Sequence, residues 1–388
     1  MKKYNFMTIM YIISLSFTSF AIGLFTLAFN LHINSIISSK FFLSNFLLVG
    51  NIAMALGGVI FGKILDKYNK TRILLVATIL SAFFFAFECF ITDKTLLYLV
   101  SLCYGLIFSI LMSIHTPFII EYVDEKNQAF TFNLCSSCKL FSSTLGIYIG
   151  GYIPLNPCVK LNGSQYQNIF IIASVSYFFA IVPLLFIQKK EKKTDTKMIK
   201  NKKTKSIPRF SAFSIIFLIL GLLLFFSPYM NLYLNNKYEI SLKNISIIIT
   251  LIEIFPVVTN ILLGKLFDYF EEIHIISACS FICIILYGLL AIFPQLLVQV
   301  ILLLCVTIIS SFLFPHINRF ILKLYPKEKM GQMSGIANLF YNLGDSLGTY
   351  TEGLFINYSL FRMPFIIASI LFFILCLFIK NLEKEHTN

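Results

Sequence analysis

Four ionisable side chains stand inside long apolar stretches of this 388-residue chain, where they could bind a solute or carry protons. They are Lys139, Glu253, Asp345 and Glu352. An ionisable group is costly in hydrocarbon, and such groups mark solute pathways, ion pathways and proton relays in membrane proteins. Each of the four is therefore a candidate for solute binding or proton coupling.

Two of these carboxyl groups belong to one predicted helix. Asp345 and Glu352 are seven residues apart, a spacing that places them on the same face of a helix. They could relay protons, or they could form a polar stripe along a water-lined surface. Gly344 and Gly348 lie beside them, and small residues let helices pack closely in a membrane.

A second set of polar side chains follows Pro228. Tyr229 and Asn231 could contact a polar solute, and Tyr233 could do so as well. For Tyr233 the alternative is a place in an aromatic belt at the membrane interface, which we favour slightly.

The composition indicates the elements that must hold these groups. Hydrophobic residues make up 58% of the chain and charged residues 13%, whereas soluble domains carry about 25% charged residues. A bilayer can accommodate this much apolar surface, at about 20 apolar residues for each crossing helix. The class indicated is an all-α membrane protein in contact with the lipid bilayer.

The chain has a net charge of +13 but carries no pattern typical of nucleic-acid binding, and ten of its 31 basic residues fall between Lys189 and Arg209. Basic clusters of this kind are typical of cytoplasmic loops. There is no phosphate-binding glycine loop and no set of metal ligands or catalytic residues in a loop. We expect no nucleic-acid partner, no cofactor, no metal and no enzymatic activity.

Twelve apolar segments reach spanning length, so we expect 12 transmembrane helices. With the N-terminus in the cytoplasm, 24 basic residues fall on the inner side and 6 on the outer side, as the positive-inside rule requires. Both termini are then cytoplasmic, and we expect a multi-pass protein of the plasma membrane. The segments lie near 7–29, 42–63, 73–91, 95–118, 129–153, 168–187, 212–234, 244–264, 273–293, 295–316, 332–356 and 363–380.

The two halves of the chain echo each other. Gly62 to Asp66 and Gly264 to Asp268 share a pattern 202 residues apart, and Gly146 and Gly151 match Gly348 and Gly353 at the same offset. A repeat of this length indicates a duplicated unit. We predict two pseudo-symmetric six-helix bundles, residues 1–187 and 210–388, joined by a basic cytoplasmic linker at 188–209, with the solute site between them.

The loop after the second segment resembles the signature of the major facilitator superfamily, Gly-x-Leu-Ala-Asp-Arg-x-Gly-Arg-Lys. Here it begins at Gly62, keeps the acidic residue at Asp66, has Asn69 in place of the second Gly, and ends in basic residues including Arg72. We expect Asn69 to support the same left-handed turn. With the helix count, the linker and the repeat, the resemblance covers the whole chain.

The resemblance implies a gating role for this loop. Asp66 would face the N-terminal end of the eleventh helix, where a helix dipole attracts an anion, and Gly264 and Asp268 would form the equivalent loop in the second half. The alternative is a solvated loop that only sets the topology.

The resemblance also bears on the fifth helix. Proton-coupled drug antiporters of the superfamily carry Gly-Pro-x-x-Gly-Gly there, and this chain keeps the glycines Gly146, Gly150 and Gly151 without the proline. It also lacks the arginine that those antiporters carry in the fourth helix.

The same family fold would bring the fifth helix against the eighth. We therefore expect Lys139 and Glu253 to meet in an ion pair that forms in one transport state and breaks in another. The alternatives are a fixed structural pair and a lysine that extends into a polar cavity.

The function that the resemblance implies is secondary active transport of a small organic solute by alternating access. We favour proton-coupled efflux by a monomer, because the expected cavity helices have few charges and many Phe residues. The alternatives are an uptake symporter or facilitator for a sugar, nucleoside or amino acid, and a non-transporting membrane sensor or scaffold.

Overall fold

The computed structural model describes residues 6–37, 41–65, 69–123, 125–153, 166–187, 210–224, 226–267, 271–323 and 330–387, without the side chains at several helix ends. Within these ranges the chain is helical and contains no strand. The predicted linker at 188–209 lies outside them. Each of the twelve predicted segments is a helix or a broken helix.

The first half of the chain supplies seven helical pieces, of which the last two form one predicted segment. They are α1 (Phe6–Ile36), α2 (Phe42–Leu65), α3 (Lys70–Phe90), α4 (Lys94–Tyr122), α5 (Glu125–Gly150), α6 (Gln167–Phe179) and α7 (Ile181–Leu185).

The second half supplies the rest, with its first segment broken into three pieces. They are α8 (Phe210–Leu222), η3 (Ser227–Tyr229), α9 (Met230–Tyr238), α10 (Leu242–Phe267), α11 (Glu272–Ile292), α12 (Leu296–Lys323), α13 (Met330–Asn357) and α14 (Met363–Thr387).

Prolines account for both broken segments. A proline inside a helix has no N–H to donate, and its ring crowds the carbonyl four residues earlier. Pro183 follows the break between α6 and α7, and Pro228 lies in the 3-10 turn η3 between α8 and α9. The segment predicted over 212–234 is therefore a spanning segment whose helix is interrupted around Pro228.

A third proline is accommodated without a break. Pro256 lies inside α10, and it leaves the carbonyl of Ile252 without its helical N–H partner. The Thr307 hydroxyl of α12 lies 3.3 Å from that carbonyl oxygen, and 3.0 and 3.1 Å from two carbonyl oxygens of its own helix. A polar side chain from a neighbouring helix thus lies beside the freed backbone oxygen, as is common in membrane helices.

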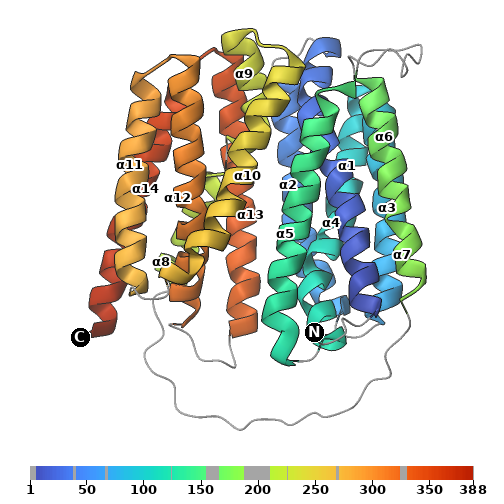
Figure 1. Cartoon of the computed structure of the whole chain (residues 1–388), viewed down its shortest axis with the longest axis horizontal. Helices are drawn as coiled ribbons and strands as arrows, with labels where there is room; N and C mark the ends of the chain where they lie inside the picture. The colour runs from blue at the N-terminus through green and yellow to red at the C-terminus, as the bar shows by residue number, and fades with distance from the viewer. Residues whose placement is uncertain are drawn as a thin grey trace.

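The helices form two groups that stand side by side (Figure 1). The N-terminal group contains α1–α7 and the C-terminal group contains α8–α14, and they meet where α2 packs on α13 and α5 packs on α10. We call the end at which α1 begins and α14 ends the terminal side, and the opposite end the far side. The chain termini both lie at the terminal side.

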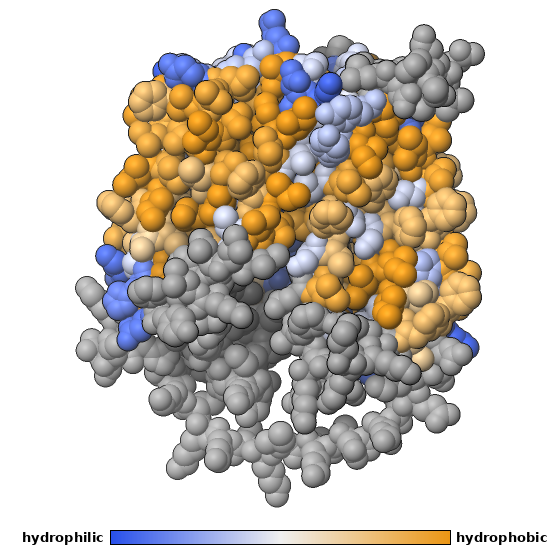
Figure 2. Space-filling model, in the orientation of Figure 1, coloured by the Kyte–Doolittle hydropathy of each residue, from blue (hydrophilic) through white to orange (hydrophobic). Residues whose placement is uncertain are grey.

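The outer surface of the groups is apolar. Figure 2 shows a broad hydrophobic band on the visible face, with hydrophilic residues above it and below it. Leu297 is 72% exposed and Leu185 63% exposed, which suits contact with lipid chains rather than water. Among the described residues, nine helical segments are long and apolar enough to cross a membrane.

The long helices α5 and α13, which are not among these nine, pack across the boundary between the groups, α5 on α10 and α13 on α2. The candidate residue Lys139 lies on α5, and Asp345 and Glu352 lie on α13.

Close helix contacts recur in the two groups at matching positions. A Cβ added at Gly146 of α5 would lie 2.3 Å from the Phe20 carbonyl oxygen of α1, and one added at Gly344 of α13 would lie 2.1 Å from the Leu218 carbonyl oxygen of α8. Both members of the second contact follow the first by 198 residues. In their packing, Gly344 is therefore the equivalent of Gly146 in the second half of the chain. The sequence repeat predicted Gly348, which lies one helical turn further along.

Asn69 does not form the left-handed turn that the sequence analysis expected. Its backbone is extended, with φ −67° and ψ 113°, and its side-chain oxygen accepts a hydrogen bond from the Thr71 N–H at 3.0 Å. It caps the N-terminus of α3, a position that favours Asn for this reason. The loop can therefore lose its second glycine because a cap takes its place.

Candidate functional site

A cavity of about 290 Å³ lies between the two helix groups. The N-terminal group contributes residues of α1 and α5, and the C-terminal group contributes the broken segment around Pro228 together with α10, α11 and α12. Most of the lining is aliphatic or aromatic, and the charged side chain in it is Glu253. We call this space the central cavity.

Glu253 is held at the cavity wall by the other helix group. The Thr144 hydroxyl of α5 donates to Glu253 Oε2 at 3.1 Å, and it also lies 2.8 Å from the Leu140 carbonyl oxygen of its own helix. This bond leaves the second carboxyl oxygen of Glu253 for a solute or a proton. Charge-bearing side chains inside a membrane protein are typical of solute and ion pathways.

Asn231 also lines the central cavity, but its amide protons are engaged. It donates to the carbonyl oxygens of Thr26 and Leu27 of α1 at 3.0 and 2.9 Å. Its own oxygen accepts from the Leu232 N–H. Asn231 therefore joins α1 to the broken seventh segment, and a solute would have to displace these bonds to use its amide group.

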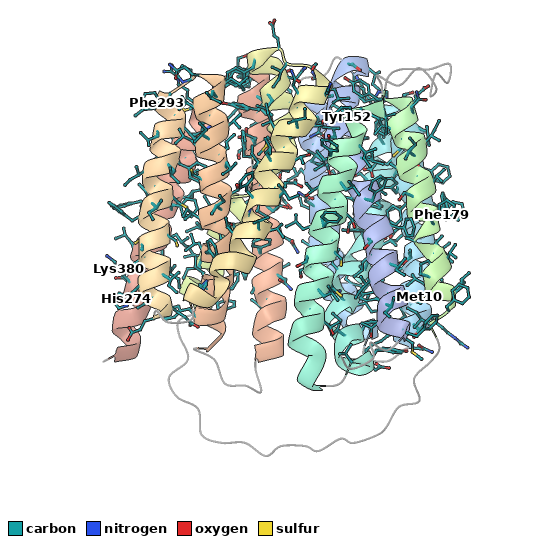
Figure 3. The ribbon with its side chains drawn as sticks, viewed as in Figure 1. Met10, Tyr152, Phe179, His274, Phe293 and Lys380 are labelled. Carbon is teal, nitrogen blue, oxygen red and sulfur yellow. The ribbon has the colours of Figure 1, made fainter. Side chains whose placement is uncertain are left out.

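Side chains close the boundary on the far side of the molecule. Asn30 of α1 donates to the Pro228 carbonyl oxygen. The Lys243 ammonium of α10 lies 5.0 Å from the centre of the Tyr152 ring, within the range of a cation–π interaction. Figure 3 labels Tyr152 at this end, next to the first turn of α10.

Two close contacts between a glycine backbone and a serine side chain also hold the groups together at this end. A Cβ at Gly151 would lie 1.9 Å from Ser246 Oγ, and one at Gly353 would lie 2.0 Å from Ser44 Oγ. The two contacts are equivalent under the repeat. Gly353 follows Gly151 by 202 residues, and Ser246 follows Ser44 by the same number. The far side is therefore closed by two matching contacts that leave no room for a larger side chain.

Asp345 lies at the contact between α13 and α2. Asn51 Nδ2 donates to Asp345 Oδ2 at 3.4 Å, and the Thr349 hydroxyl donates to Oδ1 at 3.3 Å. Both bonds are long, and neither partner is charged. The carboxyl group therefore spans the boundary without a counter-ion among the described residues.

Glu352 is fully buried. It lies about two helical turns beyond Asp345 on the same face of α13. Neither of its carboxyl oxygens has a hydrogen-bond partner in the described part of the chain. A Cβ at the neighbouring Gly353 would lie within 2.5 Å of the hydroxyl oxygens of Tyr229 and Ser44, so these hydroxyls lie close to each other beside this glycine. A buried carboxyl group without a partner is costly and uncommon in native structures, which keeps Glu352 among the candidate site residues.

Lys139 and Glu253 do not meet. Lys139 lines a separate cavity of about 110 Å³ inside the N-terminal group, and it makes no ion pair with any residue that the structure describes. Glu253 is bonded to Thr144 instead. In this conformation the arrangement matches the alternative in which the lysine extends into a polar cavity.

Three further polar residues lie inside the protein. His115 is half-buried, and its Nδ1 lies 2.8 Å from the Tyr11 hydroxyl. Tyr233 is 1% exposed and donates to Gln299 at 2.7 Å, so it does not belong to an aromatic belt. Glu88 is 4% exposed and shares a helical face with the buried residues Ser81 and Phe85.

The two proposed gating loops lie largely outside the described residues. These include neither Asp66 nor Asp268, and for Gly62 and Gly264 only the helical backbone is described. Arg72 is exposed in the first turn of α3. Gly150 packs on α1, where an added Cβ would lie 2.9 Å from Leu27 Cδ2.

Comparison with known proteins connects this arrangement to one family. The model of the Major Facilitator Superfamily matches residues 5–349. No curated protein sequence matches the chain.

Solved structures share the fold at low sequence identity. A bacterial homolog of the human lysosomal transporter Spinster, in an inward-facing and unoccupied conformation, has a TM-score of 0.75 at 12% identity, with 96% of this chain and 95% of that one covered. The nucleoside transporter NupG has a TM-score of 0.71 at 12% identity, covering 97% and 99%. The human organic anion transporter MFSD10 has a TM-score of 0.66 at 12% identity, covering 96% and 99%.

The helical architecture, the cavity between two helix groups and the match over most of the sequence agree. The chain belongs to the major facilitator superfamily of membrane transporters.

Proposed function

We propose that the protein is a secondary active transporter that moves a small organic solute by alternating access. The observation that carries this proposal is the central cavity between the groups, together with the contacts that close its far side. A transporter of this kind binds its solute near the membrane midplane and opens to one side at a time as its halves rock.

The matching contacts support two pseudo-symmetric six-helix bundles. Gly146 on Phe20 and Gly344 on Leu218 are equivalent at an offset of 198. Asn30 and Pro228, which contact each other across the boundary, are also 198 positions apart. Residues related by a two-fold axis meet near that axis, so we place the axis between α1 and η3.

The distribution of charge supports a cytoplasmic terminal side, with the protein in the plasma membrane and both termini inside. The far side would then face outward, and the closed contacts there would make this an inward-facing conformation. The similar structure of the bacterial Spinster homolog was obtained inward-facing. In this scheme Asp66 would latch the inner side in the opposite state.

The cavity lining supports an amphipathic solute and efflux. Its walls are largely apolar, which suits an organic molecule with few polar groups, and Glu253 supplies a carboxyl group. Glu253, Asp345 and Glu352 lie at or beside the boundary, so protonation of any of them could be linked to the change of state. We infer proton-coupled antiport by a monomer, since one chain contains the whole cavity.

The direct test uses purified protein in liposomes with an imposed pH gradient, and a panel of small organic solutes. The proposal predicts that at least one solute accumulates against its gradient when the pH gradient is present, and that Asp345→Asn reduces this accumulation. Proton-coupled efflux predicts that solute and protons move in opposite directions. Movement in the same direction would favour the alternative of nutrient uptake, and no flux of any solute would leave only a sensor or scaffold.

A further inference from the structure

Lys139 occupies a second cavity that the central cavity does not include. This space of about 110 Å³ lies within the N-terminal group, between α1, α3, α4 and α5. A water molecule takes up about 30 Å³ of liquid volume, so the space exceeds what one small ion fills. Met112, which lines it, is 43% exposed, so this side chain reaches from the cavity to the surface of the N-terminal group.

The cavity contains a cation and no anion. Its lining includes Lys139 and His115 but neither Asp nor Glu, and Lys139 forms no ion pair within the described residues. Glu253 belongs to the central cavity and is bonded to Thr144. A charged group withdrawn from water is stable only when it is paired or hydrogen-bonded.

The hydroxyl groups around Lys139 cannot supply the missing charge. Ser14, Thr18 and Thr78 donate their protons to backbone carbonyl oxygens at 2.7, 3.0 and 2.8 Å. Their oxygens therefore present lone pairs, which can help solvate the ammonium group but bring no negative charge. The titratable neighbours on α1, α4 and α5 are Tyr11, His115 and two thiols, Cys135 and Cys138.

Part of the cavity lining is apolar. Leu74, Phe108 and Leu111 contribute aliphatic and aromatic surface to it. A ligand that matches both kinds of lining has a negatively charged group and a small hydrocarbon body. A water molecule or a chloride ion would leave the apolar part of the lining without a partner.

We propose that this cavity binds the anionic group of a small organic molecule, with Lys139 as its counter-charge. The inference goes beyond the proposed transport function, because the site lies apart from the central cavity. Its ligand is an organic anion such as a carboxylate, a sulfonate or a phosphate ester. The hydrocarbon body packs on Phe108 and its apolar neighbours. His115, whose Nδ1 contacts the Tyr11 hydroxyl at 2.8 Å, lies beside the anion as a further polar neighbour.

Three phenyl compounds with roughly tetrahedral head groups of different charge test the proposal on the purified protein. Benzenesulfonate is a permanent anion, benzenesulfonamide is its neutral analogue, and phenyltrimethylammonium is a permanent cation. We expect benzenesulfonate to raise the thermal unfolding temperature in detergent, with the other two having no comparable effect. The neutral or cationic ligand stabilising the protein equally would overturn the proposal, and so would stabilisation by none of the three.

Variants and salt refine the test. Lys139→Met should weaken benzenesulfonate binding by at least about tenfold, whereas Lys139→Arg should retain it. Lys94→Met, which removes an exposed lysine at the start of α4, should bind like the unchanged protein. Sodium chloride at the same concentration as benzenesulfonate should stabilise the protein much less, and equal stabilisation by chloride would contradict an organic ligand.

Transport measurements separate this inference from the proposed function. Specific binding of benzenesulfonate without flux of any solute into liposomes would uphold the anion site and reject transport. Flux of solutes without specific stabilisation of the protein by benzenesulfonate would uphold transport and reject the anion site.

Discussion

Thr144 of α5 and Glu253 of α10 are joined by a 3.1 Å hydrogen bond across the boundary between the two helix groups. Glu253 also lines the central cavity. One carboxyl group therefore touches both the space for the solute and the contact between the groups. Any change in its protonation or its ligand acts on the boundary directly.

Replacing Glu253 with Gln should uncouple transport from the pH gradient. The amide keeps the size of the side chain and can still accept from Thr144, but it cannot release a proton. We expect accumulation driven by a pH gradient to fall by at least about tenfold, or about 1.4 kcal/mol, while solute exchange without a gradient continues. Thr144→Val is the matched control, which should weaken coupling less because the carboxyl group remains. Unchanged accumulation by Glu253→Gln would exclude Glu253 from coupling.

Replacing Gly151 with Ala should open the far side. The added Cβ would lie 1.9 Å from Ser246 Oγ and 2.5 Å from Ser246 Cβ, so the groups must separate there. We expect a cysteine introduced at Asn244, an exposed position in the first turn of α10, to react faster with a membrane-impermeant thiol reagent. Adding Ser246→Gly should restore the original rate. Gly288→Ala, whose Cβ meets nothing within 4 Å, should leave it unchanged.

Replacing Glu352 with Met should stabilise the protein and impair its coupling. Both carboxyl oxygens are buried without partners in the described structure, and an unsatisfied buried polar group costs about 1–3 kcal/mol. Met has a similar length and no such oxygens, so the apparent unfolding temperature in detergent should rise. Glu352→Gln, which keeps a polar group, should gain less. A lower unfolding temperature for Glu352→Met would mean that the carboxyl group has a stabilising partner.

Labelling from one side of the membrane should locate Lys200 and Asn162 on opposite sides. The positive-inside distribution places the basic segment 188–209 in the cytoplasm and the loop after α5 outside. Single cysteines at the two positions, tested in intact cells with an impermeant reagent, should react only at position 162. Reaction at both positions from outside would overturn the assigned topology.

The helices could be predicted from the sequence because a membrane imposes a strong length and composition signal on each crossing segment. The twelve segments follow from apolar runs, and the hairpin at Phe293 to Gln295 follows from Pro294. The break near Pro228 was harder to foresee, because Pro256 stays within its helix. The difference lies in tertiary neighbours such as Thr307, whose hydroxyl lies 3.3 Å from the carbonyl oxygen that Pro256 leaves free, and sequence alone does not name such neighbours.

The candidate residues could be identified by type but not by partner. Lys139, Glu253, Asp345 and Glu352 stand out as charges in apolar segments, yet their contacts depend on the rotation of each helix. The sequence repeat makes Gly348 the equivalent of Gly146 in the second half, whereas the helix contacts make Gly344 its equivalent. These two glycines are one helical turn apart. In this conformation Lys139 and Glu253 line different cavities, and an ion pair between them in another transport state stays a prediction.

Distances between spin labels on the two helix groups test alternating access most directly. One pair would join Asp93 and Gln295 on the far side, and another Phe186 and His274 on the terminal side, all exposed positions, in a functional variant without the nine native cysteines. When the pH or a transported solute shifts the conformation, the account predicts that the far-side distance lengthens while the terminal-side distance shortens. Both distances staying fixed, or both changing in the same direction, would contradict it.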